Sequence, residues 1–225
     1  MIPIIAIRPE PGLSATVAQG AQLGLEISRF PLSEVRPCDW ELPDLTGIDG
    51  LLVGSANALR HGGEQLSTLN HLPVLAVGET TAQQARQLGF EVEHIGEGGL
   101  QHLIDGLGSA PRHLLRLAGA ARVPLDLPGH ICLTDRVIYQ LEDVEISVER
   151  QRILRDDCIV LLHSAGATVH FARECDRLGL RRSNIALATL GPRILEAAGD
   201  GWREARAAPI PTDIALLAMV RDMCH

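Results

Sequence analysis

The stretch Asp49-Gly-Leu-Leu-Val-Gly-Ser-Ala-Asn-Ala58 returns in altered form as Asp157-Cys-Ile-Val-Leu-Leu-His-Ser-Ala-Gly-Ala167. Each copy is an apolar run that ends at a serine and leads into a helical pattern. The two serines are 109 residues apart, and two further landmarks follow at offsets of 113 and 112 residues, Gly78 with Gly191 and Gly89 with Gly201. This near-constant offset is longer than the period of a solenoid repeat, so the sequence predicts two similar α/β domains.

Short apolar runs alternate with amphipathic stretches along the whole chain. We predict strands at Ile2–Ile7, Leu25–Phe30, Gly50–Val53, Val74–Val77, Leu114–Leu117, Ile131–Thr134, Cys158–Leu162 and Ile185–Leu190. We predict helices at Leu13–Leu23, Asn57–Leu66, Thr80–Leu88, Ala165–Leu178, Pro192–Ala198 and Thr212–Met223. Apolar strands separated by helices are typical of a parallel sheet covered on both faces. The fold class is therefore α/β, with two flavodoxin-like or Rossmann-like parallel-sheet domains.

One domain is predicted to be inserted into the other, because the opening βαβ segment has no counterpart between the copies unless it belongs to the second. Two polar segments, Pro31–Pro43, which prolines interrupt, and Asp135–Ile146, are typical of connections between domains. A chain that crosses twice between lobes predicts a cleft that opens and closes. The predicted boundaries are 1–31 plus 145–225 for domain 1, 38–134 for the inserted domain 2, and 32–37 and 135–144 for the linkers.

Composition excludes several classes of protein. The 225 residues include 20 Lys and Arg against 28 Asp and Glu, a net charge of −8, and 46% of the chain is hydrophobic. Such a chain is globular rather than disordered, and it is long enough to fold without a disulfide or a metal. The acidic balance, with only two Trp, one Tyr and three Phe, disfavours nucleic-acid binding. An anionic partner would need a local binding cluster, because the overall field repels it.

The sequence also indicates a cellular location. No apolar run is long enough to span a membrane, and the apolar N-terminal segment lacks the basic region of a signal peptide. The five cysteines are widely spaced, without a C-x-x-C pair, which is typical of reduced thiols: Cys38, Cys132, Cys158, Cys175 and Cys224. We therefore expect a cytoplasmic protein whose cysteines serve as core thiols rather than nucleophiles.

No standard catalytic or cofactor motif is present. There is no G-x-G-x-x-G after a strand, no P-loop, no G-x-S-x-G and no H-E-x-x-H. We interpret Gly96-Glu-Gly-Gly99 as a loop between elements. His163 and His170 are seven residues apart around a helix start, and no third metal ligand is near them in the sequence. We expect no metal and no cofactor.

A strand that ends at a small or hydroxyl residue and turns directly into a helix does recur. Such turns begin at Gly54, Gly78, Ala118, Ser164 and Gly191. The carboxyl ends of parallel strands form a ligand crevice, and helix N-termini attract carboxylates and phosphates. Alternatively, several of the polar residues are simply helix N-caps: Ser55, Asn57, Thr80 and Ser164. Five such turns together favour a polyanionic ligand that is bound largely by the main chain.

Arginines and one phenol near these turns are the other candidates. The arginines are either surface charges or ligand contacts: Arg8, Arg60, Arg116, Arg122 and Arg193. Arg8 directly follows the first predicted strand and is the strongest single candidate. Tyr139, the only tyrosine, lies in the second predicted linker, where its phenol either packs or reaches into the cleft.

At these positions the sequence resembles the uroporphyrinogen-III synthase family. In chain order, the resemblance is carried by Ile7-Arg8-Pro9, Ser55-Ala56-Asn57-Ala58, Ala76–Ala82, Leu117-Ala118-Gly119, Val137-Ile138-Tyr139 and Leu162-His163-Ser164. It covers essentially the whole chain, with the family's inserted-domain layout. The chain departs from the family pattern after Ser164, where a proline is frequent, after Pro192, where a hydroxyl is missing, and after Gly119, where an acidic residue is common.

The resemblance implies a cofactor-free lyase that acts on hydroxymethylbilane, a linear tetrapyrrole with eight carboxylates. Such an enzyme releases water and closes the ring with inversion of ring D through a spirocyclic intermediate, which is mainly a problem of positioning. Tyr139 then assists departure of the hydroxyl as the catalytic residue. The residues implied to bind substrate in the inter-domain cleft are Arg8, Ser55, Ala56, Asn57, Gly78, Thr81, Gly119, Ser164 and Gly191.

The same resemblance implies a role in tetrapyrrole and heme biosynthesis. We expect a monomer that makes transient contact with the preceding enzyme of the pathway. Two other classes of protein stay open from the residues themselves. One is a cytosolic two-lobed sensor that binds a small anion without catalysis, and the other is a Rossmann-type nucleotide enzyme, which the missing glycine motif disfavours.

Overall fold

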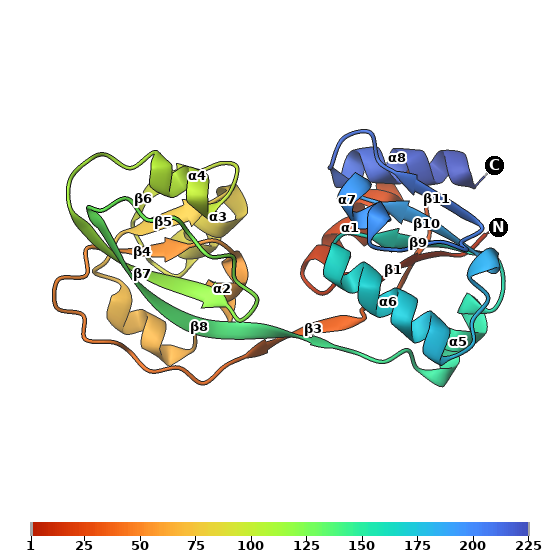
Figure 1. The fold of residues 1–225 in the computed structure, drawn as a ribbon, viewed down its shortest axis with the longest axis horizontal. Helices are drawn as coiled ribbons and strands as arrows, with labels where there is room; N and C mark the ends of the chain where they lie inside the picture. The colour runs from red at the N-terminus through yellow and green to blue at the C-terminus, as the bar shows by residue number, and fades with distance from the viewer. Residues whose placement is uncertain (1, 225) are drawn as a thin grey trace. The chain divides into compact units, whose positions relative to one another are not determined.

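The computed structural model describes residues 2–224, which form two compact units (Figure 1). The first unit runs from the N-terminus to Glu34 and from Glu142 to the C-terminus, and the second unit is Val35–Leu141. The chain passes between them within two strands, β3 (Ser33–Pro37) and β8 (Ile131–Asp143), which are neighbours in one sheet. No helix among residues 2–224 is long and apolar enough to cross a membrane.

The first unit is built on a five-stranded parallel sheet. In spatial order its strands are β11 (Glu204–Ala207), β10 (Ile185–Thr189), β9 (Cys158–Leu162), β1 (Ile4–Ala6) and β2 (Ile27–Arg29). Every neighbouring pair is parallel. Numbered within the unit, this is the flavodoxin-like order 2-1-3-4-5, in which the direction of winding reverses between β1 and β9. Ligands of such sheets bind at the carboxyl ends of the strands on either side of that reversal.

Helices cover both faces of this sheet. On one face, Leu13 of α1 (Gly12–Gln22) and Leu216 of α8 (Asp213–Met223) pack with Ile4 of β1. On the other face, Phe171 packs with Ile5. The helices on that second face are α5 (Val148–Leu154), α6 (Ala165–Arg177) and α7 (Pro192–Glu196), and a short 3-10 helix, η2 (Arg182–Asn184), precedes β10. Successive residues of a strand point to opposite faces, so a strand covered on both sides is apolar throughout.

The second unit has a six-stranded sheet that is mainly parallel. In spatial order its strands are β3, β8, β7 (Arg112–Gly119), β4 (Gly50–Val53), β5 (Val74–Val77) and β6 (Val92–Gly96). The direction of winding reverses between β4 and β7. The helices are α2 (Ala56–Arg60), the 3-10 helix η1 (Glu64–Leu69), α3 (Glu79–Gln87) and α4 (Leu100–Asp105). Ala82 of α3 packs with Leu51 on one face of the sheet, and Leu103 of α4 packs with Leu52 on the other.

The predicted α/β class is confirmed, and so are the eight predicted strands. Three of them, β4, β5 and β9, have the predicted bounds, four differ by one or two residues at an end, and β8 continues well past its predicted end at Thr134. The internal repeat has a structural cause. Its two copies are β4 and β9, each of which lies beside the reversal of winding in its own sheet and ends at a serine-capped helix. The repeated sequence therefore marks the position at which each sheet can bind a ligand.

Several helices and strands of the structure are absent from the sequence prediction. Strands β3, β6 and β11 and helices α4 and α5 were not predicted, because each is short and is partly exposed. The predicted helix Asn57–Leu66 is wrong, because α2 already ends at Arg60. Two glycines, Gly62 and Gly63, separate α2 from η1, and Gly63 has a φ of 72°. The segments predicted as polar linkers are also largely strand, because β-branched and aromatic residues such as Val137, Ile138 and Tyr139 extend β8 to Asp143.

The cysteines only partly match their expected role. All five are free thiols, and two of them, Cys158 and Cys175, are buried core residues. Burial raises the pKa of each of these two thiols to about 12, so neither is a nucleophile. Cys132 is exposed, and Cys38 and Cys224 are partly exposed, so the prediction of core thiols is wrong for Cys132.

Candidate functional site

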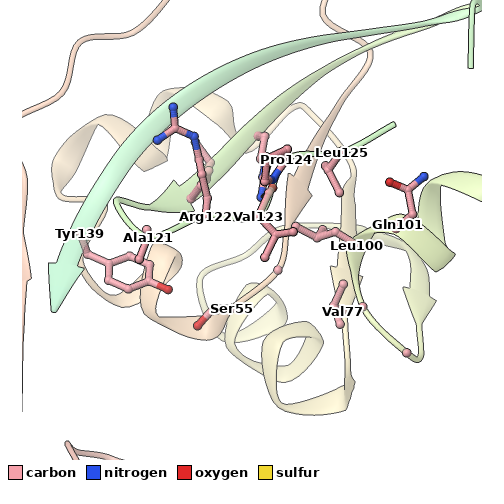
Figure 2. Close-up of a pocket in the computed structure, with 17 residues that line it drawn as sticks. Ser55, Val77, Leu100, Gln101, Ala121, Arg122, Val123, Pro124, Leu125 and Tyr139 are labelled. Carbon is pink, nitrogen blue, oxygen red and sulfur yellow. The ribbon is translucent and has the colours of Figure 1, made fainter. Parts of the chain in front are cut away.

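A pocket of about 410 Å³ lies at the carboxyl ends of β4 and β7, where the second sheet reverses its winding (Figure 2). Apolar side chains make up much of its wall. Its lining comes from the turn after β4, the turn before α4, the end of β7 and the loop that follows, and β8: Gly54, Ser55, Val77, Gly98, Gly99, Leu100, Gln101, Arg116, Leu117, Ala118, Gly119, Ala121, Arg122, Val123, Pro124, Leu125 and Tyr139. Of the candidates named from the sequence, it brings together Ser55, Gly119 and Tyr139 with two of the arginines, Arg116 and Arg122.

Glycines allow the apolar wall to approach the strand ends. An ideal Cβ on Gly54 would lie 2.9 Å from Cδ1 of Leu100, so a larger residue there would displace that side chain. Gly98 and Gly99 have φ angles of 77° and 105°, a conformation that turns the chain into α4 and that other residues rarely adopt. The sequence interpretation treated these glycines as a plain loop. The consecutive Gly-Gly pair after a strand was the available signal of a sharp turn beside a ligand site.

A register shift places Tyr139 in the pocket. Ala118 pairs with Val137, whereas the next residue, Gly119, pairs with Tyr139, so β8 advances by two residues where β7 advances by one. Ile138, the extra residue, is fully buried in the core of the unit. Figure 2 shows the hydroxyl groups of Ser55 and Tyr139 pointing toward the same part of the pocket. Tyr139 is thus a strand residue of the second unit, not the linker residue that the sequence suggested.

The cationic side of the pocket is formed by Arg116, whose side chain is only 5% exposed. Its Nη2 donates a hydrogen bond to the carbonyl oxygen of Val123 at 3.0 Å. Its Nε lies 3.8 Å from Oδ1 of Asp135, and neither of these buried atoms has a hydrogen-bond partner among the described residues. Arg122 Nε lies 3.6 Å from Oδ2 of the same carboxylate.

Burial lowers the pKa of Arg116 below its ordinary value. The negative charge of Asp135 acts against this lowering, and the positive charge of Arg122 adds to it. A buried cation whose Nε completes no hydrogen bond is poorly compensated, so an anionic group in the pocket would stabilise its charge. The pocket therefore suits a ligand with an apolar body and an acidic group.

The other predicted residues of the second unit lie outside this pocket's lining. Ala56 and Thr81 are buried in the first turns of α2 and α3. The amide of Gly78 donates to the carbonyl oxygen of Gly96 at 2.9 Å, and the Asn57 side chain accepts from Arg60 at 3.2 Å. The structure does not bring these four residues to Tyr139.

The N-cap interpretation holds for two of the four residues to which it applied. The side chain of Ser55 accepts from the amide of Asn57, and that of Ser164 accepts from the amide of Ala167, each at 3.3 Å. It is wrong for Asn57 and Thr80, which lie inside the first turns of α2 and α3.

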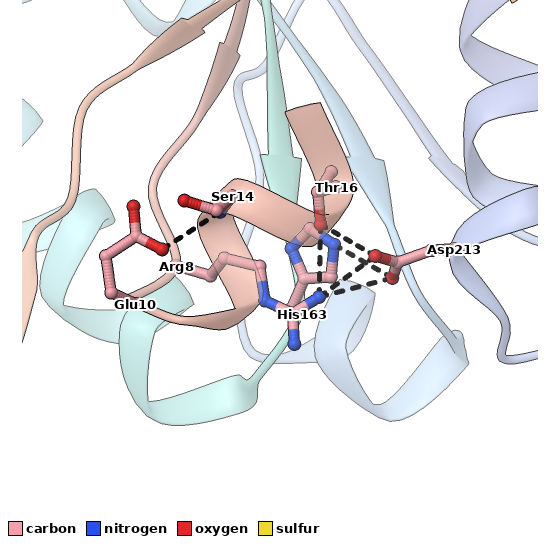
Figure 3. A network of polar contacts seen from close by, with 6 residues as sticks. All are labelled: Arg8, Glu10, Ser14, Thr16, His163 and Asp213. Carbon is pink, nitrogen blue, oxygen red and sulfur yellow. Dashed lines mark hydrogen bonds and ion pairs between the residues drawn. The ribbon is translucent and has the colours of Figure 1, made fainter. Parts of the chain in front are cut away.

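A second cluster lies in the first unit, at the reversal between β1 and β9 (Figure 3). Arg8, which follows β1, forms an ion pair with Asp213 at the start of α8, 3.0 Å from Nη1 to Oδ2. The hydroxyl of Thr16 donates to the same oxygen at 2.6 Å, and His163 Nε2 lies 3.3 Å from Oδ1. Burial alone would raise the pKa of Asp213, but the contacts of His163, Thr16 and Arg8 outweigh it and hold that pKa at about 2. Asp213 is therefore ionised and fixes three partners.

Two more predicted residues of the first unit cap helices beside this cluster. Ser164 is exposed and caps α6, and Gly191 is the partly exposed N-cap of α7. Sequence reasoning found Arg8 and Ser164 but missed Thr16 and Asp213. Within residues 2–224, no group of three or more His, Cys, Asp and Glu side chains is arranged to hold a metal ion.

A known protein family matches most of this chain. The family model described as uroporphyrinogen-III synthase HemD matches residues 14–218. The chain belongs to the uroporphyrinogen-III synthase family. This family match confirms the resemblance noted from the sequence motifs.

Individual members of the family are distant from this chain. A uroporphyrinogen-III synthase of Chlorobaculum parvum is 32% identical over 99 residues, a match that spans 40% of this chain and 40% of that protein. The uroporphyrinogen-III synthetase structure from Helicobacter pylori 26695 has a TM-score of 0.67 at 18% identity and covers 99% of this chain and 100% of its own. A mutant uroporphyrinogen III synthase from the extremely thermophilic bacterium Thermus thermophilus has a TM-score of 0.53 at 16% identity, covering 99% and 97%. At these identities, the two structures support the fold alone.

Proposed function

We propose that this protein is a uroporphyrinogen-III synthase, a lyase that cyclises hydroxymethylbilane to uroporphyrinogen III with loss of water and inversion of ring D. The family match over residues 14–218 supports this assignment. The observation that carries it is the largely apolar pocket in the second unit, which is lined by Tyr139 and by Arg116, a buried cation whose Nε completes no hydrogen bond among the described residues. An apolar pyrrole ring with an acidic side arm matches both properties.

The proposed chemistry begins with departure of the substrate hydroxyl, which needs a proton. Backbone N–H groups cannot transfer one, whereas a phenol is protonated at neutral pH and can act as a weak general acid. Tyr139 is the proposed donor, because its ring is held against Gly119 at the end of β7. Loss of the hydroxyl leaves an electrophilic azafulvene, and the substituted carbon of ring D must attack it before the unsubstituted one does. Closure through the spirocyclic intermediate is then decided by how the substrate is held.

The eight carboxylates of the substrate require many donors. In the second unit, the proposed contacts are Ser55, Ala56, Asn57, Gly78, Thr81 and Gly119. In the first unit, they are Arg8, Ser164 and Gly191. Arg116, one of the arginines named from the sequence, is a further proposed contact, because it lines the same pocket as Tyr139. The proposal uses no metal or cofactor, and it places the protein in the cytoplasm as a monomer that makes transient contact with the preceding pathway enzyme.

The function is tested by supplying hydroxymethylbilane from its own synthase and separating the oxidised products by isomer. The expected product is isomer III, while the control without the protein gives isomer I. A non-catalytic sensor for small anions would leave isomer I as the product. Isomer I at every protein concentration would overturn the proposal.

A further inference from the structure

The guanidinium of Arg8 is held by one of its three nitrogens. Nη1 donates to Oδ1 and Oδ2 of Asp213 at 3.3 and 3.0 Å, and it donates to Oγ1 of Thr16 at 3.1 Å. Nε and Nη2 make no hydrogen bond within the described part of the chain. Figure 3 shows both of them directed away from Asp213. These two nitrogens form the edge that grips a carboxylate with two parallel hydrogen bonds.

Neighbouring residues fix this orientation. Thr16 is fully buried, and its hydroxyl accepts from Arg8 while it donates to Asp213. An ideal Cβ on Gly12 would lie 2.5 Å from Nε and 2.5 Å from Nη2, so only glycine lets the guanidinium lie against the first turn of α1. The arginine is therefore ordered before any ligand arrives, and a ligand does not have to order it.

The buried imidazole of His163 is a further polar group of this cluster, and Asp213 is its contact there. The side chain of His163 is 6% exposed, and neither of its ring nitrogens completes a hydrogen bond, although Nε2 lies 3.3 Å from Oδ1 of Asp213. The nearby carboxylate of Glu10 accepts from the amide of Ser14 at 3.0 Å and forms an ion pair with Arg29 at 3.2 Å. Its charge is thus partly offset by Arg29.

We infer that Arg8 is a preorganised fork for one carboxylate of the substrate, with Nη1 anchored and the Nε–Nη2 edge presented to the ligand. Asp213, Thr16 and Gly12 are positioning residues that set its direction without touching substrate. This inference rests on the proposed function and deepens it, because it assigns a binding mode to one arginine and a role to residues that lie up to 205 positions away in sequence. The location at the reversal of a flavodoxin-like sheet agrees with where such sheets bind ligands.

The first test separates a fork from a simple positive charge. Arg8→Lys keeps the charge and loses the bidentate edge, and Arg8→Gln loses both. We expect both variants to raise KM for hydroxymethylbilane by about tenfold or more, the effect of losing a charge-assisted hydrogen bond, with kcat little changed. A wild-type KM for Arg8→Lys would overturn the proposal that the Nε–Nη2 edge binds a carboxylate with two hydrogen bonds.

The second test addresses the positioning residues. Thr16→Val removes the hydroxyl at nearly constant shape, and Asp213→Asn removes the charge that anchors Nη1. We expect each to raise KM severalfold, with recovery in Thr16→Ser. Asp222→Asn, the same change at an exposed position of α8, is the matched control and should leave KM unchanged. Thermal melts recorded beside the kinetics identify a merely structural role, which would lower Tm at an unchanged KM and overturn the inference. If wild-type protein makes no isomer III, it is the proposed function that fails instead.

Discussion

The ring of Tyr139 lies so close to Gly119 that an ideal Cβ on the glycine would be 2.8 Å from Cζ and 3.1 Å from the hydroxyl oxygen. No real side chain tolerates that approach, so the glycine defines where the phenol lies. The register shift between β7 and β8 makes these two residues partners. The position of the proposed proton donor therefore depends on a glycine in the neighbouring strand β7.

Removing the Tyr139 hydroxyl tests the chemistry separately from the packing. Tyr139→Phe keeps the ring against Gly119, and we expect kcat to fall by at least roughly tenfold. This expected loss is smaller than the usual contribution of a general acid, because solvent can supply some of the protons. Tm should change little. The measurement is initial rate with coupled substrate generation, together with a thermal melt. A wild-type kcat would reduce Tyr139 to a packing residue.

Moving the phenol should have a similar effect to removing its hydroxyl. Gly119→Ala forces the ring away from its place, and we expect kcat to fall about as far as in Tyr139→Phe, about tenfold. Gly129→Ala is the matched control, since a Cβ there meets no atom within 4 Å and the backbone has no unusual φ. Equal rates for the two glycine variants would show that the site tolerates a displaced phenol.

Substrate binding is expected to be distributed over many groups. Ser55→Ala, Thr81→Ala and Ser164→Ala each remove about one hydrogen bond, on the order of 1–3 kcal/mol at a charged acceptor. We therefore predict that none of the three abolishes activity, although loss of the Ser55 or Ser164 cap costs about 1 kcal/mol of stability. Complete inactivity of any one of these variants in a folded protein would mean that a single side chain dominates binding.

Arg116 is predicted to act in binding rather than in stability. Arg116→Met keeps much of the volume and removes a poorly compensated buried charge, so Tm should stay close to that of the wild type. KM for hydroxymethylbilane should rise about tenfold, the effect of one lost charge-assisted hydrogen bond. Arg221→Met, at an exposed position of α8, is the control for a general loss of positive charge. If KM is unchanged while Tm falls, Arg116 is a structural residue.

The alternation of apolar strands with helices was enough to predict the central strands of both sheets, because strands buried on two faces leave a continuous apolar signal. The partly exposed strands β3, β6 and β11 leave no such signal. The repeated serine at β4 and β9 likewise marked the two positions where the sheets reverse. Tyr139 was assigned to a linker because a register shift leaves no pattern in a single strand. Asp213 could not be linked to Arg8, since a contact across 205 positions depends on how the sheet is wound.

Stability at acidic pH should depend on Glu174. Hydrogen bonds from Arg177 at 2.6 and 2.7 Å, with one from the amide of Ile146 at 2.9 Å, hold the pKa of this buried carboxylate at about 2. The folded-state pKa lies below the ordinary value of 4.5, so the stabilisation is complete above pH 4.5 and is lost as the pH falls toward 2. It amounts to roughly 3 kcal/mol at most.

We expect Glu174→Gln to lower the free energy of unfolding by about 2 kcal/mol at pH 7, and by progressively less between pH 4.5 and 2. Urea unfolding across that range measures the difference. Glu196→Gln, at an exposed position of α7, should leave the curve unchanged. A difference that does not depend on pH would contradict the account of this ion pair.

The isomer composition of the product tests the central claim most directly. Hydroxymethylbilane closes by itself to isomer I, so the fraction of isomer III reports only closure that the protein directs. With a fixed supply of substrate, that fraction should rise with protein concentration until isomer III is nearly the sole product. Tyr139→Phe should need at least roughly tenfold more protein to reach the same fraction. A product that stays isomer I at the highest protein concentration would contradict the account.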